Sequence, residues 1–120
     1  MKNIFLSFSF LSLLFACEPE AVYNESDLLG TWHCYQWETN GDMQQIGKGS
    51  VNFNFTPNKY EYKGGDYNEE GTWKFSGDLL VTKIEGLVKK EVKLARLSQD
   101  TLILDMLDNG VPMMMYLAKE

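Results

Sequence analysis

The chain has 120 residues, of which 44% are hydrophobic and 23% are charged, which suits one small globular domain. Its 17 acidic residues outnumber its 11 Lys and Arg residues, for a formal net charge of −6. That sign argues against nucleic acid as a partner, because nucleic acid binding requires a basic face. The single histidine excludes a zinc site built from several histidines.

The N-terminus combines a basic start, an apolar run and a cysteine. Lys2 precedes the run Ile4–Phe15, which is shorter than the roughly 20 residues that span a bilayer core and is typical of a secretory signal. The segment Leu13-Leu14-Phe15-Ala16-Cys17 resembles the lipobox of bacterial lipoproteins, in which a peptidase cleaves before a cysteine that carries a diacylglyceryl group. The resemblance implies a lipoprotein signal peptide over 1–16 and lipidation of Cys17. An ordinary signal peptide or a buried N-terminal strand is the alternative.

Residues 17–26 are polar, contain Pro19 and show no periodicity, which predicts a flexible tether between lipid and domain. No polybasic stretch is present, so we expect acyl chains on Cys17 to provide the membrane attachment. Glu18 and Glu20 resemble surface-export signals of some Gram-negative lipoproteins, and a solvated linker is the alternative. We therefore expect a cell-envelope protein at the outer membrane of a Gram-negative bacterium, on either side of that membrane.

Residues 27–120 alternate between short strand-like runs and turn signals. In Ser50–Thr56, for example, Val51, Phe53 and Phe55 alternate with polar residues, which is the period of a strand with one buried face. The only helix expected is a single turn near residues 27–29, capped by Asn24 or Ser26. We expect strands over 31–37, 50–56, 59–63, 67–75, 79–84, 89–97, 102–107 and 113–118.

About eight strands joined by hairpin-length turns predict an all-β domain, namely a small antiparallel up-and-down β-barrel. The strongest hairpin signal is Asp108-Asn109-Gly110, because Asn-Gly tolerates the positive φ of a type I′ turn. Closure into a barrel removes exposed strand edges. A two-sheet sandwich is the alternative, but the chain has few of the long connections that Greek keys need.

Three motifs occur in order along this domain: Leu28-Leu29-Gly30-Thr31-Trp32, Gly71-Thr72-Trp73 and a hairpin at 97–102. Gly30-Thr31-Trp32 resembles the Gly-x-Trp signature of lipocalins, in which the tryptophan packs across the closed end of the barrel. The three motifs together resemble bacterial lipocalin-like lipoprotein domains over 27–120, which implies a binding scaffold. The domain is shorter than a typical lipocalin, so the presence of a roomy cavity stays open.

Catalytic chemistry finds little support in the residues. A nucleophile–base pair would have to use His33, and its neighbour Cys34 points to the opposite face of the strand. With Cys17 lipidated, Cys34 also lacks a disulfide partner and is expected to be a small buried residue. Glu69 and Glu70 diverge on a strand for the same reason as His33 and Cys34. We expect a non-enzymatic protein with no cofactor and no bound metal.

An eight-stranded barrel is either filled by its side chains or holds one small ligand. The many large aromatic residues favour a filled core, whereas methionines near one end suit an adaptable apolar mouth. Our leading hypothesis is a monomer that binds a small apolar ligand, or the acyl portion of a lipid, at the open end. The alternative is a solid interaction module, for example an inhibitor, that contacts a protein or glycan partner. Its contact surface would be rims bearing His33, Tyr35, Trp37 and Tyr60. The candidate interior residues are Trp32, Phe53, Phe55, Tyr62, Trp73, Phe75, Met106, Met113 and Met115.

Overall fold

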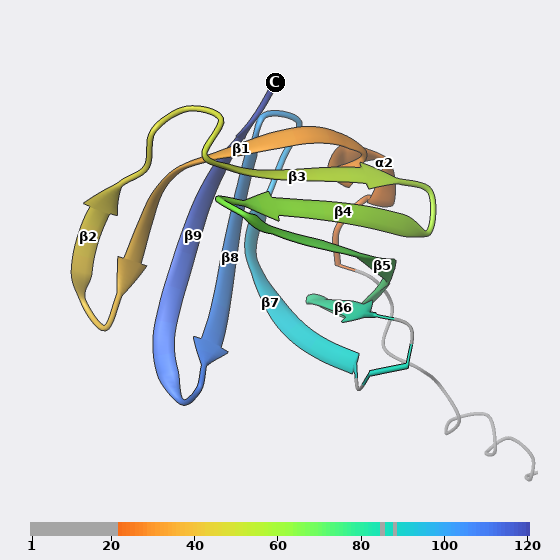
Figure 1. Cartoon of the computed structure of the whole chain (residues 1–120). Coiled ribbons are helices and arrows are strands. Elements are labelled where there is room, and N and C mark those ends of the chain that lie inside the picture. The colour runs from red at the N-terminus through yellow and green to blue at the C-terminus, as the bar shows by residue number, and fades with distance from the viewer. Residues whose placement is uncertain (1–21, 85, 88) are drawn as a thin grey trace, which may run out of the picture.

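The computed structural model describes residues 22–84, 86–87 and 89–120 of the chain. The predictions of a signal peptide over 1–16 and of lipidation at Cys17 lie outside these residues. Within them, one helical turn, α2 (Glu25–Leu28), lies at one end of a curved sheet (Figure 1). Asn24 caps this turn, as expected, because its side-chain oxygen accepts a hydrogen bond of 3.0 Å from the backbone N–H of Ser26. No described helix is long and apolar enough to cross a bilayer.

The described residues form nine strands in one antiparallel sheet. They are β1 (Gly30–Thr39), β2 (Asp42–Gln45), β3 (Val51–Thr56), β4 (Lys59–Gly64), β5 (Tyr67–Ser76), β6 (Leu79–Lys83), β7 (Lys89–Leu97), β8 (Thr101–Asp108) and β9 (Val111–Lys119). Consecutive strands from β3 to β9 pair in order, and β1 pairs with both β3 and β9. These pairings close eight strands into a barrel, which confirms the predicted all-β, up-and-down architecture.

The strand β2 is the element that the sequence did not predict. It pairs with the second half of β1, while β3 pairs with the first half, so β2 projects beside the ring of eight strands (Figure 1). Asn40 and Gly41 form the connecting turn with φ of 52° and 91°, as a type I′ hairpin requires. Every residue of β2 is exposed, so no alternation of apolar and polar residues marks this strand in the sequence.

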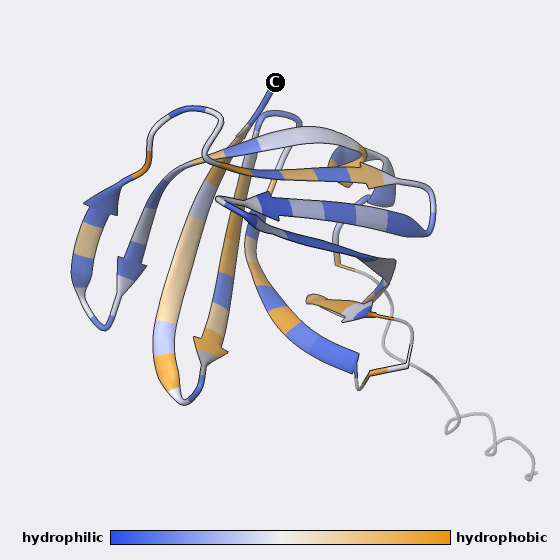
Figure 2. Ribbon diagram, in the orientation of Figure 1, coloured by the Kyte–Doolittle hydropathy of each residue, from blue (hydrophilic) through white to orange (hydrophobic). Residues whose placement is uncertain are grey.

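The barrel interior is built from the apolar residues that alternate along each strand, visible as changes of colour along the ribbons in Figure 2. On β3, Val51 and Phe55 are buried, as predicted, and on β9 the same holds for Met115 and Leu117. Cys34 is also fully buried, as expected for a small apolar residue. The alternation of the sequence therefore identifies the inner face of the sheet correctly.

Trp32 closes the end of the barrel next to α2. Its side chain is fully buried, and its Nε1 donates a hydrogen bond of 2.8 Å to the carbonyl of Leu28. Lys119 Nζ lies 4.9 Å from the centroid of the Trp32 ring and donates to the carbonyl of Asp27 at 2.9 Å. The indole thus joins the helical turn to β1 and β9, which confirms the expected packing of this tryptophan across the closed end.

A β-bulge changes the facing of the second half of β1. The register of β1 with β9 shifts between Cys34 and Gln36, so Tyr35 is an extra residue in the ladder. The extra residue moves the inward-facing set from even to odd positions. Trp37 then lies opposite the buried Met115, and it faces the interior of the barrel.

The described part of the predicted tether, residues 22–26, contacts the barrel. Val22 donates its backbone N–H to the carbonyl of Gly77 at 3.0 Å, in the turn between β5 and β6. The hydroxyl of Tyr23 donates to the carbonyl of Leu94 on β7 at 3.3 Å. The β5–β6 turn lies at the same end as α2, so the chain reaches the barrel from its closed end.

Candidate functional site

A cavity of about 480 Å³ occupies the end of the barrel opposite α2. It is bounded by the far half of β1, the start of β5, the end of β8 and the start of β9, and all eight barrel strands contribute side chains to it. The lining residues are Trp37, Phe53, Tyr60, Tyr62, Tyr67, Glu69, Leu80, Thr82, Lys90, Val92, Leu104, Met106, Leu107, Met113 and Met115. The cavity is therefore the open half of the barrel interior.

The nine candidate interior residues divide between this cavity and the core beneath it. Those that line the cavity are Phe53, Tyr62, Met106, Met113 and Met115. Those that pack in the core toward the closed end are Trp32, Phe55, Trp73 and Phe75. Alternation along a strand shows which residues face inward, but it does not show their height along the barrel axis. The sequence therefore grouped residues that the structure separates into two layers.

The cavity has an aromatic wall formed by β3, β4 and β5. The ring centroids of Phe53 and Tyr62 lie 4.8 Å apart, and those of Tyr62 and Tyr67 lie 6.0 Å apart. Trp37 adds a ring from β1, with its Nε1 donating to Gln44 Oε1 on β2 at 2.6 Å. Because β2 supplies that acceptor, the indole N–H is satisfied while the ring faces the cavity. The projecting hairpin thus helps to position one wall of the site.

The opposite wall is aliphatic and comes mainly from β8 and β9. Leu104 and Met115 are buried at the floor of the cavity, and Met106 and Met113 are half-buried above them. Unbranched methionine side chains adapt to irregular shapes at little cost in free energy. This wall can therefore follow the outline of an apolar ligand.

Glu69 places a carboxylate inside this largely apolar cavity. The alternation of β5 puts Glu69 on the inner face, directly opposite Tyr62 of β4, and the side chain is half-buried. The hydroxyl of Tyr60 donates a hydrogen bond to Glu69 Oε2, and that of Tyr67 donates to Oε1 at 2.8 Å. Glu70 lies on the outer face, so the two adjacent carboxylates diverge, as the sequence analysis expected.

The tyrosines around Glu69 are held in their neutral form. Burial raises the pKa of Tyr60, and the hydrogen bond to the Glu69 carboxylate raises it further. Burial also raises the pKa of Tyr62, while the pKa of the exposed Tyr67 is raised chiefly by its hydrogen bond to Glu69. A neutral phenol can donate to a carboxylate, whereas a phenolate cannot. The arrangement therefore keeps both donors on Glu69.

The prediction of a rim bearing Trp37 and Tyr60 is wrong at Tyr60, which is 2% exposed. Tyr60 faces inward on β4, where its ring lies 6.2 Å from that of Phe55. Trp37 lines the cavity because of the bulge in β1, which the sequence did not reveal. Tyr35, the bulged residue itself, is exposed, as that prediction required.

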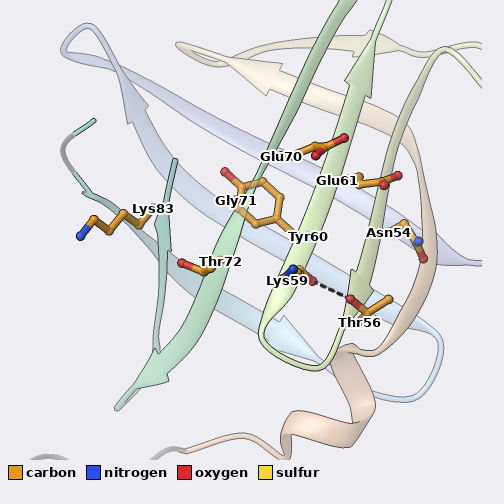
Figure 3. Close-up of a pocket in the computed structure, with 9 residues that line it drawn as sticks. All are labelled: Asn54, Thr56, Lys59, Tyr60, Glu61, Glu70, Gly71, Thr72 and Lys83. Carbon is orange, nitrogen blue, oxygen red and sulfur yellow. Dashed lines mark hydrogen bonds between the residues drawn. The ribbon is translucent and has the colours of Figure 1, made fainter. Parts of the chain in front are cut away.

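A second hollow, of about 490 Å³, opens on the outer face of β3, β4 and β5 (Figure 3). Its outward-facing lining carries both signs of charge, from Lys59 and Lys83 and from the cross-strand pair of Glu61 and Glu70. Gly71 also lines the hollow, and an added Cβ at this position would collide with the carbonyl oxygen of Lys83. Mixed charges on an open strand surface are typical of a solvated face, so the interior cavity is the better candidate site.

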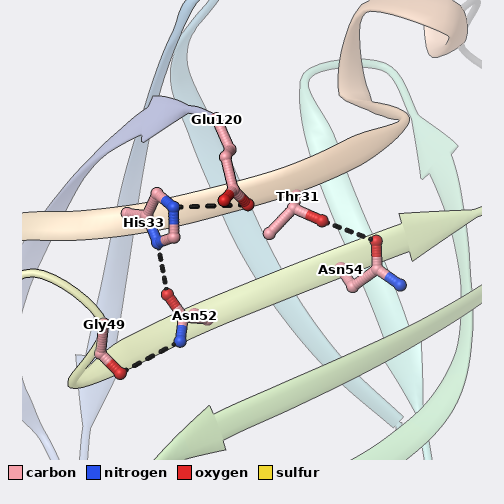
Figure 4. A network of polar contacts seen from close by, with 6 residues as sticks. All are labelled: Thr31, His33, Gly49, Asn52, Asn54 and Glu120. Carbon is pink, nitrogen blue, oxygen red and sulfur yellow. Dashed lines mark hydrogen bonds and ion pairs between the residues drawn. The ribbon is translucent and has the colours of Figure 1, made fainter.

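His33 lies on the outer face of β1, within a polar network that ties β1, β3 and the C-terminus (Figure 4). Its Nδ1 is 2.6 Å from Asn52 Oδ1, and the Asn52 amide donates to the carbonyl of Gly49 at 3.1 Å. That second bond fixes Oδ1 as an acceptor, so Nδ1 of His33 is the donor. His33 Nε2 faces Glu120 Oε1 at 3.4 Å without hydrogen-bond alignment.

His33 and Cys34 therefore do not form a nucleophile–base pair. His33 faces outward, while the Cys34 thiol is buried inside the barrel, where desolvation raises its pKa. Among residues 22–84, 86–87 and 89–120, no three His, Cys, Asp or Glu side chains gather as metal ligands would.

Comparisons with known proteins agree with this geometry. Residues 28–104 match the lipocalin-like domain family. A crystal structure of a lipocalin-like protein from Bacteroides uniformis superposes with a TM-score of 0.62 at 20% sequence identity, covering 78% of this chain and 99% of that one. An uncharacterized protein from Bacteroides eggerthii gives a TM-score of 0.61 at 11% identity, covering 77% and 98%. No curated protein matches the sequence.

Proposed function

Because the chain belongs to the lipocalin-like domain family, we propose that it binds a small apolar ligand, or the acyl portion of a lipid, in the open end of its barrel. The observation that carries this proposal is the cavity of about 480 Å³ lined by every strand of the barrel. Small-molecule sites are typically concave, mostly apolar and about 300–1,000 Å³ in volume. The cavity meets each of these criteria.

The alternative of a solid interaction module has less support. It requires a filled barrel that acts through exposed aromatic rims. Cavity-lining side chains such as Phe53 and Met113 leave the open half unfilled, and Tyr60 is buried. We therefore retain ligand binding as the function.

The proposed activity is binding without a catalytic step. The residues that could have formed a nucleophile–base pair, His33 and Cys34, lie on opposite faces of β1, and His33 is engaged by Asn52. Among the described residues, Glu69 is the carboxylate that lines the cavity, and it accepts hydrogen bonds from two tyrosine hydroxyls. This arrangement supports a polar contact for a bound molecule.

We further propose that the mature protein is a monomeric lipoprotein of the cell envelope, anchored through Cys17 at the outer membrane of a Gram-negative bacterium. The lipobox-like segment Leu13–Cys17 supports the anchor, and the net charge of −6 supports the expectation that nucleic acid is not a partner. In this proposal, residues 1–16 are a signal peptide that is removed before the protein matures.

The anchor proposal also orients the barrel. The stretch from Cys17 to Val22 spans at most about 18 Å when fully extended, and Val22 is bonded to Gly77 at the closed end. A lipid on Cys17 would therefore hold the closed end near the bilayer, so that the cavity opens away from the anchoring membrane. The ligand would then enter from the aqueous side.

Calorimetric titration of the Cys17→Ala protein with decanol tests the ligand-binding proposal. We expect saturable binding of one decanol per barrel, because an alkyl chain suits an apolar cavity of this size. Met113→Trp, which adds bulk inside the cavity, should abolish the binding. Met43→Trp is the matched control, because Met43 is exposed on β2. Absence of binding to the parent protein, or loss of binding in both variants, would contradict the proposal.

A further inference from the structure

Among the described residues, no cationic side chain pairs with the negative charge of Glu69 in the cavity. The two oxygens of Glu69 accept hydrogen bonds from Tyr60 and Tyr67, which are neutral donors. Hydrogen bonds from neutral groups stabilise a carboxylate but leave its charge uncancelled. In the described part of the chain, no ion pair joins Glu69 to a basic side chain. A half-buried charge of this kind is costly unless something pairs with it.

The surroundings of Glu69 favour a cation as that missing partner. Tyr62 lies directly opposite on β4, with the ring of Phe53 4.8 Å from its own on one side and the ring of Tyr67 6.0 Å away on the other. Aromatic faces attract ammonium groups through their negative quadrupole. Each carboxylate oxygen also keeps a lone pair beyond the one that a tyrosine uses. Carboxylate and rings therefore present the same sign of field to a ligand.

Within the described part of the chain, Lys90 is the basic residue that lines the same cavity. It is exposed on β7, and β6 separates β7 from β5, so two strand spacings of about 4.8 Å each lie between the backbones. Lys90 pairs with Thr82 of β6, which in turn pairs with Trp73 rather than with the Glu69 end of β5. No ion pair joins Lys90 to Glu69 among the described residues, so Lys90 does not neutralise the Glu69 carboxylate by direct contact.

We propose that the cavity selects apolar molecules that carry a cationic amine head group, with Glu69 as the countercharge and the rings of Tyr62 and Tyr67 beside it. The inference rests on the proposed function, because it assumes that the apolar portion enters the cavity. The alkyl portion lies against Leu104 and the methionines of β8 and β9. The head group remains near the half-buried Glu69, where solvent still reaches it.

Three probes of equal chain length separate the head group from the alkyl chain: decylamine, decanol and decanoate. The Cys17→Ala protein is titrated with each by calorimetry at pH 7, below the concentrations at which the probes form micelles. We expect decylamine to bind about tenfold more tightly than decanol, and decanoate to bind more weakly than decanol. This comparison needs no substitution near the site, so it does not depend on the folding of a variant.

Glu69→Gln then tests the assignment to one residue, because it keeps the shape of the side chain and removes its charge. We expect the affinity for decylamine to fall to that for decanol, while the affinity for decanol stays unchanged. Lys90→Gln is the matched control, since it removes the other charge that lines the cavity, and it should preserve the preference for decylamine. Far-ultraviolet circular dichroism checks that both variants retain the barrel.

The outcomes distinguish this inference from the proposed function. Equal affinities for the three probes, or tightest binding of decanoate, would overturn the selection for an amine while leaving ligand binding intact. Preference for decylamine that survives Glu69→Gln would overturn the role of Glu69. Failure of all three probes to bind would overturn both proposals.

Discussion

Replacing Trp32 with Ala tests how far the closed end of the barrel depends on one side chain. Trp32 is 0% exposed and is one of the largest fully buried side chains. Truncation of a buried tryptophan to Ala costs about 3–5 kcal/mol in unfolding free energy. That range includes the loss of the 2.8 Å hydrogen bond to Leu28, a bond whose net contribution is about 1 kcal/mol. A domain is stable by only about 5–15 kcal/mol, so Trp32→Ala should leave the barrel marginally folded.

Urea denaturation of the Cys17→Ala protein, followed by far-ultraviolet circular dichroism, measures this loss, because the signal reports the sheet and not the deleted fluorophore. Trp32→Phe should lose less, since it retains a ring and removes the Nε1 donor. Leu107→Ala is the control, because Leu107 is 70% exposed and surface substitutions usually stay within about 0.5 kcal/mol. A loss below about 1 kcal/mol for Trp32→Ala would refute the claim that this indole holds the closed end together.

Four further predictions concern the anchor, the barrel wall, the tyrosines and the orientation. Cys17→Ala should abolish the incorporation of radiolabelled palmitate into the protein, and continued labelling would contradict lipidation at Cys17. Gly71→Ala should lower the unfolding free energy by about 1–3 kcal/mol, because the added Cβ would meet the Lys83 carbonyl and a Tyr60 ring carbon at 2.9 Å. Gly47→Ala is its control, with Ser50 Oγ at an ordinary 3.4 Å, and equal losses in urea melts would refute the steric argument. The raised pKa values of Tyr60, Tyr62 and Tyr67 mean that the unfolded chain releases these protons first, near pH 10. Stability is therefore fully present below pH 10 and falls as the pH rises above it; urea midpoints that stay constant between about pH 9 and 11 would show otherwise. On lipidated protein in vesicles, a fluorophore at Leu107→Cys should lie roughly 20 Å farther from the bilayer than one at Gln99→Cys. Equal efficiencies of energy transfer from the two sites to a lipid dye would contradict the proposed orientation.

Much of the barrel can be predicted from the sequence because its strands have one solvent-exposed face and one buried face. The alternation in Val51–Thr56 assigns Val51 and Phe55 to the interior, where both are buried. Asn109-Gly110 takes the positive φ values, 54° and 83°, that a type I′ turn demands. Local signals of this kind determine the order and facing of the strands. Hairpin-length turns then leave the closed meander as the natural topology.

The elements that the sequence did not predict are those whose cause is not local. Strand β2 has no buried face, so its sequence shows no alternation of apolar and polar residues. It forms because the second half of β1 has a free strand edge with which it can pair. The bulge at Tyr35 is a property of the pairing between β1 and β9, which are far apart in the sequence. Without the bulge, Trp37 would be assigned to the outer face. Its place in the cavity follows from the register of the closed barrel.

The position of Glu69 inside the barrel can be predicted from the alternation of residues along β5. As adjacent residues of a strand, Glu69 and Glu70 point to opposite faces and do not form a carboxylate pair. The inner face of β5 runs through Tyr67, Glu69 and Trp73, however, so the alternation that places Trp73 inside also places a carboxylate there. A charge at an inward position of a barrel strand conflicts with burial unless a function compensates for it. The conflict itself, more than any motif, is the signal that points to the site.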